Sequence, residues 1–289
     1  RSYRSHSPIF VDTNLAKCKH CGLVYADPMP SPELLVEYNS DYSVNAHGGL
    51  NTNPNAMLFF SGMAQLRLDF VLNYLREEMT CLGSMLEVGP GHGFFCKHFR
   101  EQFPQARCTV IESDPNCYDL LRSIGADIYT DFDPVAALSS EFDLLVLSHV
   151  LEHSADPFEF LLKPIDLLKS GGVVFIEVPC CDYKFKEEDE PHLLFFDKTS
   201  MMELCNRLGL KDIQLTYHGE EISKIQMKKT GFPSKLIDRL AAKWQMVFRN
   251  SCRPPSITDP AVWSSVRSYD AHLEKQNPSW WLRTLARKP

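Results

Sequence analysis

The sequence has little of what would assign it to several whole classes of protein. Its apolar runs, such as Leu144-Leu145-Val146-Leu147, fall far short of the about 18 residues that cross a bilayer. Ten cysteines scattered over 289 residues are too sparse for a disulfide scaffold. Lys and Arg number 30 against 37 Asp and Glu, so the net charge is −7 and not the positive charge that grips nucleic acid or anionic lipid. We expect a cytoplasmic protein with no membrane and no nucleic acid as partner.

Repeats, low-complexity tracts and a recognisable leader peptide are also missing from the sequence. The first residue is Arg1 and not Met, so we expect that residues upstream of it have been removed. Hydrophobic residues make up 44% of the chain, which is enough for an ordinary packed core. The length suits one large domain or two modest ones.

Short apolar runs alternate with helical stretches from Ser84 onward, as in βαβ units with a parallel sheet. The predicted strands are Met85–Val88, Thr109–Ile111, Asp127–Tyr129, Leu144–Leu147, Val173–Val178 and Asp212–Thr216. The predicted helices are 62–79, Phe94–Phe103, Cys117–Ile124, Pro157–Leu168 and Ser200–Leu208. Gly171-Gly172 is expected to end the helix that starts at Pro157. The pattern predicts an α/β fold with a doubly wound, Rossmann-like sheet of about seven strands.

A glycine-rich turn between a strand and a helix is the most informative segment. It reads Leu86-Glu87-Val88-Gly89-Pro90-Gly91-His92-Gly93-Phe94. Glycine lets the backbone turn sharply and lets a ligand approach the main chain. The spacing is G-x-G-x-G, whereas a dinucleotide fold requires G-x-G-x-x-G and a phosphate P-loop requires Gly-Lys-Ser/Thr. The turn therefore predicts a different ligand.

Three acidic residues accompany the turn and describe that ligand. Glu87 precedes the turn, where a carboxylate repels a pyrophosphate and suits an ammonium group. Glu112 ends the second predicted strand, where a carboxylate can accept both ribose hydroxyls. Asp131 follows the third strand, within reach of a purine amine. Together they describe a nucleoside with a cationic amino-acid tail, which is S-adenosylmethionine. A glycine turn that binds nothing is the alternative, and the agreement of strand, loop, helix and acids disfavours it.

These residues resemble the class I S-adenosylmethionine-dependent methyltransferases, in particular the small-molecule group related to ubiquinone-type enzymes. The resemblance covers roughly residues 15–216 and includes Phe142–His153, Asp156-Pro157, Leu167–Gly172 and Ile176–Pro179. It implies that Gly89, Gly91 and Gly93 line the methionine part of the cofactor, that Glu112 holds the ribose, that Asp131 and Phe132 flank the adenine, and that Ser148 and His149 lie beneath the sulfonium. It also implies an amino-terminal segment folded over the cofactor, with a contact from Tyr42; plain hydrophobic packing of Tyr42 is the alternative.

Four segments are expected on this basis. They are a partial zinc-ribbon-like segment at 1–45, a helical cap at 46–80, the S-adenosylmethionine-binding catalytic domain at 81–218 and a carboxy-terminal extension at 219–289. A homodimer through that extension is one arrangement that the sequence allows.

Cys18 and Cys21, in Cys-x-x-Cys-Gly, provide half of a tetrahedral zinc site. The resemblance implies that they are the second knuckle of a small structural zinc ribbon. Three interpretations stay open: the first knuckle lies upstream of Arg1, or it is lost and the thiols are free, or a pair such as Cys180-Cys181 completes the site.

Methyl transfer to a hydroxyl needs a base, and histidine is the side chain suited to that task near neutral pH. His149 and His192 are the two candidates, with packing or a backbone hydrogen bond as the alternative for each. Glu152 is expected to orient one of them. His149 and His153 also have metal-like i, i+4 spacing, without an obvious third ligand in the sequence.

The expected function is methyl transfer from S-adenosylmethionine to a small molecule. By resemblance to the ribbon-bearing group, the acceptor is a hydroxyl of a sugar or a related biosynthetic intermediate. Methylation of nitrogen or carbon stays open. The rival classes are a nucleic-acid methyltransferase, suggested by a basic, tryptophan-bearing carboxy-terminal region, and a non-catalytic protein that binds the same cofactor.

Overall fold

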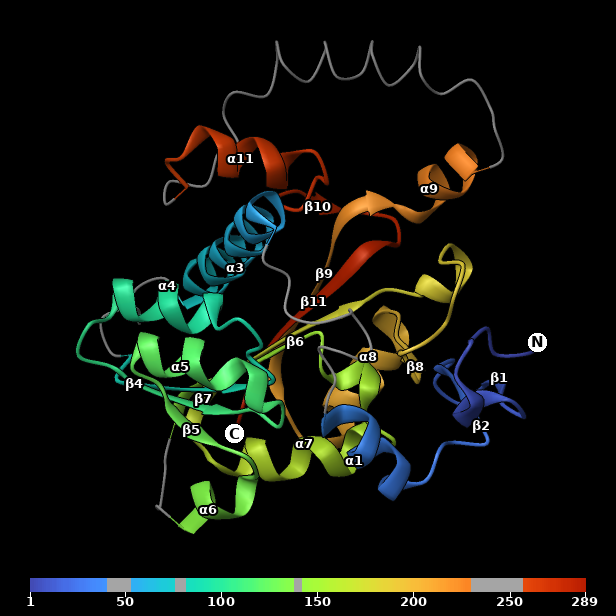
Figure 1. The fold of residues 1–289 in the computed structure, drawn as a ribbon, viewed down its shortest axis with the longest axis horizontal. Coiled ribbons are helices and arrows are strands. Elements are labelled where there is room, and N and C mark those ends of the chain that lie inside the picture. The colour runs from blue at the N-terminus through green and yellow to red at the C-terminus, as the bar shows by residue number, and fades with distance from the viewer. Residues whose placement is uncertain (41–52, 76–81, 138–141, 230–256) are drawn as a thin grey trace.

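The computed structural model describes residues 1–40, 53–75, 82–137, 142–229 and 257–289. Its main sheet contains β3 (Ser84–Val88), β4 (Arg107–Ile111), β5 (Asp127–Tyr129), β6 (Phe142–Ser148), β7 (Leu168–Pro179), β9 (Lys211–Glu221), β10 (Glu274–Lys275) and β11 (Ser279–Arg287). Within the described residues the strand order is β10-β9-β11-β7-β6-β3-β4-β5 (Figure 1). The five strands from β5 to β7 run parallel, and β11 runs antiparallel to both of its neighbours.

The helices cover both faces of this sheet (Figure 1). They are α1 (Pro32–Ser40), α3 (Pro54–Leu75), α4 (Phe94–Gln102), α5 (Tyr118–Ile124), α6 (Phe132–Ala137), α7 (Pro157–Asp166), α8 (Lys198–Arg207), α9 (Ile222–Lys229) and α11 (Pro260–Arg267). Because side chains alternate along a strand, Met85 and Leu144 pack with α3, α4 and α5, whereas their neighbours Leu86 and Leu145 pack with α7 and α8. The predicted doubly wound α/β fold is confirmed.

Short one-turn helices connect several of these elements. They are η1 (Pro8–Phe10), η3 (Pro115–Cys117), η4 (Leu151–His153) and η5 (Asp182–Lys184). The last two follow β6 and β7 at the carboxyl ends of those strands. They therefore place polar side chains where a doubly wound sheet binds its ligand.

The prediction for Gly171-Gly172 is wrong. Helix α7 ends at Asp166, and both glycines lie inside β7. Gly171 has a positive φ of 76°, and its N–H donates to the Lys288 carbonyl. A Cβ on Gly172 would lie 2.9 Å from the Lys169 carbonyl oxygen. The pair thus serves a close backbone approach at the start of a strand.

Strand β11 lies in residues 219–289, the segment predicted as a carboxy-terminal extension, and it belongs to the main sheet. This strand pairs with β7 on one side and with β9 on the other, so it is an interior strand of the sheet. Its sequence, Ser-Trp-Trp-Leu-Arg-Thr-Leu-Ala-Arg, carries two arginines and two tryptophans. It is part of the basic, tryptophan-bearing carboxy-terminal region that suggested a nucleic-acid substrate. The other predicted segment boundaries stay predictions. No helix in the described part of the chain has the length and apolarity to span a membrane.

The amino-terminal residues form a second, smaller sheet that supports one loop of the main domain. Strands β1 (Asn14–Lys17) and β2 (Val24–Asp27) form a hairpin, and β2 pairs with β8 (Leu194–Phe195). The Tyr3 hydroxyl donates to the His192 carbonyl at 2.8 Å. Arg1 and Arg4 both pair with buried Asp189. This segment therefore holds the loop that carries His192.

The position of β11 predicts that the carboxy-terminal strand and the rest of the sheet unfold together. Leu285 of β11 is fully buried against α3 and α4. Leu285→Ala should lower the free energy of unfolding by about 2–5 kcal/mol in a single urea transition followed by circular dichroism. Leu120→Ala is the control, because Leu120 is 37% exposed and its truncation should cost less than about 0.5 kcal/mol. Two separate transitions in Leu285→Ala would contradict the arrangement.

Candidate active site

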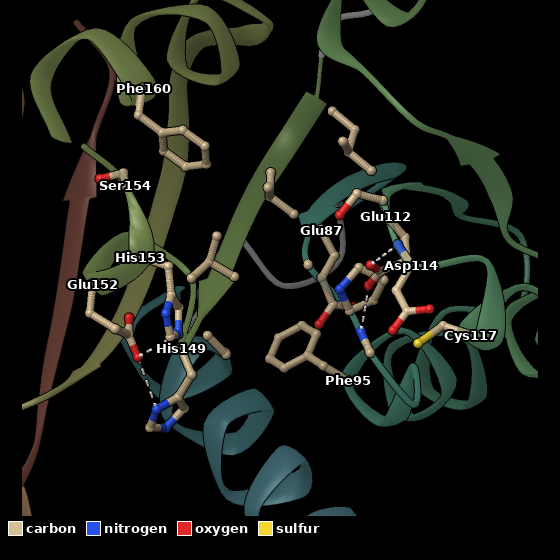
Figure 2. Close-up of a pocket in the computed structure, with 18 of the residues that line it drawn as sticks. Glu87, Phe95, Glu112, Asp114, Cys117, His149, Glu152, His153, Ser154 and Phe160 are labelled. Atoms are coloured by element: carbon tan, nitrogen blue, oxygen red, sulfur yellow. Dashed lines mark hydrogen bonds and ion pairs between the residues drawn. The ribbon is translucent and has the colours of Figure 1, made fainter. Parts of the chain in front are cut away.

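A cavity of about 1340 Å³ opens at the carboxyl ends of the parallel strands. It lies where the strand order reverses beside β3, which is the place where open α/β sheets bind ligands. The turns after β3, β4, β5 and β6 all contribute to its lining. Figure 2 shows that its labelled side chains form two groups: Glu87, Glu112 and Asp114 on one side, and His149, Glu152 and His153 on the other.

The three glycines of the turn after β3 all have positive φ, between 53° and 69°, but they differ in what surrounds them. A Cβ on Gly89 would lie 2.6 Å from Val150, and one on Gly93 would lie 2.7 Å from Leu121 and Ile124. A Cβ on Gly91 would meet no described atom within 4 Å. Gly89 and Gly93 are therefore required by packing, and Gly91 faces the open cavity where a ligand can approach the backbone.

Glu87, at the end of β3, lies in the floor of the cavity. Burial raises its pKa to about 8, so at neutral pH it holds its proton unless a cation lies beside it. Its Oε2 has no hydrogen-bond partner among the described residues. The ammonium of an amino-acid tail would donate a hydrogen bond to that oxygen and favour the ionised form of Glu87. Glu87 was predicted to face such an ammonium group, and this contact stays a prediction.

Glu112 lies just beyond the end of β4, where it was predicted to hold a ribose. Its two carboxylate oxygens accept the backbone N–H groups of Gly91 at 3.0 Å and Asp114 at 2.9 Å. Burial nevertheless raises the pKa of Glu112 above its ordinary value. The carboxylate is therefore fixed against the glycine turn. Each oxygen keeps a second lone pair for a ligand hydroxyl.

Asp131, Phe132 and Ser148 line the same cavity, and their contacts with the cofactor stay predictions. Asp131 accepts the backbone N–H of Phe132, and the Phe132 ring packs edge-on against Phe160. The Ser148 hydroxyl is buried, with no hydrogen-bond partner in the described part of the chain. Tyr42, the remaining predicted cofactor contact, lies outside the described residues.

His149 follows β6 and lies between two buried carboxylates. Its Nδ1 is 3.4 Å from Glu152 and its Nε2 is 3.2 Å from Glu177. Burial opposes its protonation, but the two neighbouring carboxylates, Glu152 and Glu177, outweigh this and raise the pKa of His149. The residue has a φ of 59°, which is strained for a side chain other than glycine. One third of the side chain faces the cavity.

Glu177 of β7, which the sequence did not single out as a site residue, is a fully buried carboxylate with several charged partners. Its Oε1 accepts from Arg67 of α3 at 2.6 and 2.8 Å, and its Oε2 accepts from Arg283 of β11 at 2.6 Å. Burial opposes ionisation, but the two guanidinium groups hold the pKa of Glu177 well below its usual range. Glu177 thus joins α3, β7 and β11 directly beneath His149.

His192 and His153 meet at Glu152, on the wall away from the glycine turn. The Nε2 atoms of His153 and His192 lie 3.9 and 4.0 Å from Glu152 Oε1. Burial lowers the pKa of His153 to about 4, so its ring is neutral at neutral pH. Burial also opposes the ionisation of Glu152, but His149 and its two companion histidines keep the pKa of that carboxyl below its ordinary value. The structure therefore gives Glu152 three histidine neighbours, where the sequence predicted that it would orient one.

Asp182, on η5, determines the orientation of His192. The His192 Nδ1–H donates to Asp182 Oδ2 at 2.7 Å, and Lys186 pairs with the same oxygen at 2.9 Å. Burial opposes the ionisation of Asp182, but the hydrogen bond from His192 and the nearby positive charges hold its pKa well below the usual range. The bond to Nδ1 directs Nε2 of His192 toward Glu152 and the cavity.

Aromatic residues form much of the remaining wall, and the sequence did not identify them. They come from α3, from the segment after α11 and from β11, and include Phe59, Phe60, Tyr269, Trp280 and Trp281. Trp280 and Trp281 stack at a centroid distance of 5.7 Å, and Tyr269 packs edge-on against Trp280 at 5.9 Å. The nonlocal pairing of β11 brings Trp280 and Trp281 to the cavity.

Cys18 and Cys21 lie in the hairpin turn between β1 and β2, away from this cavity. The turn has a knuckle form: the Gly22 N–H donates to the Cys18 carbonyl, and the Cys18 N–H donates to the Leu23 carbonyl. Backbone N–H groups of Cys21 and His20 lower the pKa of the Cys18 thiol. The hollow beside the two thiols is lined by Asp197 and Thr199. In the described residues no third ligand atom joins the two cysteines, and the zinc ribbon stays a prediction.

A comparison with family models identifies the family of this chain. Residues 60–215, more than half of the chain, match the methyltransferase domain family. The chain belongs to the methyltransferase domain family. It is an S-adenosylmethionine-dependent methyltransferase of class I fold, which confirms the predicted reaction and cofactor. No curated protein matches the sequence.

Solved methyltransferases share the fold of this enzyme. The plantazolicin methyltransferase BamL, in complex with a triazolic desmethylPZN analogue and SAH, aligns with a TM-score of 0.53 and 12% identity over 89% of this chain and 98% of its own. A methyltransferase from Archaeoglobus fulgidus aligns at 0.45 and 14%, over 76% and 94%. Coclaurine N-methyltransferase aligns at 0.46 and 14%, over 77% and 72%. At such identity the likeness concerns the fold alone.

The different surroundings of the glycines predict different effects of alanine at two of them. Both substitutions place a side chain at positive φ, which costs about 1–2 kcal/mol. Gly93→Ala also overpacks buried Leu121 and should lose about 1–3 kcal/mol more in urea unfolding. Gly91→Ala should fold with the smaller loss but bind S-adenosylhomocysteine at least tenfold more weakly by calorimetry. Unchanged affinity in Gly91→Ala would remove this residue from the path of the ligand.

The pairing of Glu177 predicts a pH-dependent contribution to stability. Glu177→Gln leaves two buried guanidinium groups without their anion and should cost about 3–5 kcal/mol in urea unfolding at pH 7. Because the folded pKa is depressed, this contribution is complete above the unfolded pKa of about 4.3 and is lost as the pH falls through the folded value. The difference from the native chain should therefore shrink below about pH 4. Glu188→Gln, at an exposed position, is the control and should change stability by less than about 0.5 kcal/mol at either pH.

Proposed function

We propose that this methyltransferase transfers the methyl group of S-adenosylmethionine to a hydroxyl of a small molecule, such as a sugar or another biosynthetic intermediate. One observation carries the proposal. The glycine turn with Glu87 and Glu112, and the histidine group with Glu152, line the two sides of a single cavity (Figure 2). A cofactor on the first side would present its methyl group toward the second, where an acceptor proton can be removed.

His192 is the better of the two predicted bases. Its Nδ1–H bond to buried Asp182 leaves the lone pair on Nε2, in the same way that a carboxylate sets the tautomer of a catalytic histidine. His149 is less suited, because a carboxylate faces each of its ring nitrogens and favours the charged form, which cannot accept a proton. We assign His149 to positioning beneath the sulfonium and Glu152 to the orientation of the histidines.

The lining of the cavity supports an acceptor with a flat, apolar face. Trp280, Tyr269 and Phe59 offer ring faces and edges that pack well against a ring system or the C–H face of a sugar. Nitrogen acceptors need orientation more than a base, so the Asp182–His192 pair favours a hydroxyl. Methylation of nitrogen or carbon is the second candidate.

The structure weakens the support for a nucleic-acid substrate. Arg283, one of the basic residues that suggested it, is buried and paired with Glu177. Other basic side chains of the predicted tail also have acidic partners, such as Lys275 with Asp270 at 2.8 Å. The cytoplasmic location and a homodimer through residues 219–289 stay predictions. The main part of β11 has strands on both sides and offers no edge to a partner.

A substitution at His192 tests the assignment. His192→Ala should lower kcat about 10²–10⁴-fold with a hydroxyl acceptor, since a general base contributes that much to the rate. Its calorimetric affinity for S-adenosylhomocysteine should stay within a factor of about three, because the cofactor side of the cavity is untouched. Radiolabelled S-adenosylmethionine with a panel of phenols, catechols and sugars identifies the acceptor class, and the O-methyl ethers of the same compounds should not react.

The matched control is His6→Gln, a change at an exposed histidine that should leave turnover unaltered. Near-normal turnover of His192→Ala at saturating acceptor would refute the base assignment and favour a nitrogen or carbon acceptor. S-adenosylhomocysteine binding with no transfer to any acceptor class would instead favour a non-catalytic binding protein.

A further inference from the structure

Three side chains with metal-binding atoms converge on one wall of the cavity. Glu152, His153 and His192 each bring one ligand atom to within 4.8 Å of the other two. Among the described residues, these three side chains form the cluster that could hold a metal ion. Glu152 is 0% exposed, yet neither of its carboxylate oxygens has a hydrogen-bond partner in the part of the chain that the structure describes. A buried carboxylate needs a nearby cation to offset the cost of its desolvation, and His149, the nearest one at 3.4 Å, also pairs with Glu177. The ion pairs of Glu152 in the described residues are with histidines alone.

The two histidines are held in the orientation that metal ligands require. His192 Nδ1 bonds to the Asp182 carboxylate at 2.7 Å, and His153 Nδ1 bonds to the Pro191 carbonyl at 3.2 Å. Ligand histidines almost always donate their second ring N–H to a carboxylate or a backbone carbonyl, which sets the tautomer and the ring plane. Both Nε2 atoms then face the same Glu152 oxygen. Two histidines that served packing alone would not require Nδ1 hydrogen bonds that direct both Nε2 atoms toward one carboxylate oxygen.

We propose that Glu152, His153 and His192 bind one divalent transition-metal ion of the zinc class inside the active-site cavity. Two imidazoles and one carboxylate form the donor set of catalytic zinc sites and of related iron sites, which keep a further position for water or substrate. Imidazole nitrogens favour these ions over magnesium and calcium, which prefer oxygen ligands throughout. The sequence paired His153 with His149 by their spacing, whereas the proposed site pairs His153 with Glu152 and His192.

The geometry requires a small adjustment on binding. Ligands 2.0–2.2 Å from a tetrahedral metal lie about 3.4 Å from one another. The Nε2 atoms lie 3.9 and 4.0 Å from Glu152 Oε1, so each distance must shorten by about half an ångström. Rotation of the Glu152 side chain would shorten these two distances, because no described group donates a hydrogen bond to its oxygens. The three ligand atoms lie within 4.8 Å of one another, so the two imidazoles would also have to move closer together.

The role of the ion rests on the proposed function, whereas its binding does not. An acceptor hydroxyl that takes the open coordination position would face the cofactor and have its pKa lowered by the metal. Its proton would pass to solvent water, its oxygen would bond the methyl carbon, the carbon–sulfur bond would break, and S-adenosylhomocysteine would leave as a neutral thioether. The lone pair of His192 would then belong to the metal, and the metal would replace the general base.

Direct metal titration tests the site without any acceptor. The chain carrying Cys18→Ser and Cys21→Ser, which removes the thiolates of the hairpin, is titrated with Zn²⁺ by calorimetry and with Co²⁺ by visible absorption. We expect one equivalent per chain. Glu152→Gln and His192→Gln should each weaken Zn²⁺ binding at least tenfold, and Asp182→Asn should weaken it about 10–100-fold through the orientation of His192. His6→Gln is the control and should bind as tightly as the parent.

Thermal melting of every variant verifies that it folds, and His153→Gln replaces Glu152→Gln if that variant is unfolded. Absence of saturable binding in the chain with Cys18→Ser and Cys21→Ser overturns the proposal, as does binding that Glu152→Gln and His192→Gln leave unchanged. Methylation assays after chelation, and again after re-addition of Zn²⁺, separate the metal proposal from the proposed function. If hydroxyl methylation persists at full rate without metal, the proposed role of the ion in the reaction fails and the proposed function stands. If the metal binds but no hydroxyl is methylated, the proposed function fails and the metal site stands.

Discussion

The buried carboxylate of Glu177 is the interaction on which the architecture of the site depends. An anion in the middle of a sheet is costly to desolvate, and here it is compensated by Arg67 from a helix and Arg283 from the last strand. Loss of Arg67 or Arg283 would leave the Glu177 carboxylate with one guanidinium partner. The pairing therefore requires α3, β7 and β11 to be in place together, and only then is His149 held under the cavity by the same carboxylate.

Glu152 lies across His149 from Glu177 and has the opposite electrostatic situation. Glu177 has two guanidinium groups, whereas the described ion pairs of Glu152 are with three histidines, of which His153 is neutral at neutral pH. Glu177 is thus fully compensated by the protein and acts in the fold. Glu152 is incompletely compensated and lies in the wall of the cavity. A site that has to receive a cation or a proton needs a carboxylate of the second kind.

The parallel half of the sheet could be predicted from the sequence, because each strand is a short apolar run followed by a local helix. The glycine turn and its acidic partners could be predicted for the same reason: each lies at a strand end or just beyond one. The residues that complete the site could not. Arg67 and Arg283 are 110 and 106 positions from Glu177 in the chain, and Asp182 is recognisable as the partner of His192 only after η5 and the loop before β8 are placed side by side. β11 was missed because its pairing is nonlocal and its composition resembles that of a basic tail.

The glycine turn shows the same division between local and tertiary information within five residues. The motif marks three glycines as equivalent, and the positive φ of each is a local property that the motif does predict. Val150 against Gly89, and Leu121 and Ile124 against Gly93, are tertiary contacts that make those two glycines indispensable to packing. Gly91 lacks such a contact in the described residues and remains open to the cavity. Two glycines therefore fix the shape of the turn, and this fixed shape is what allows the third to present bare backbone to a ligand.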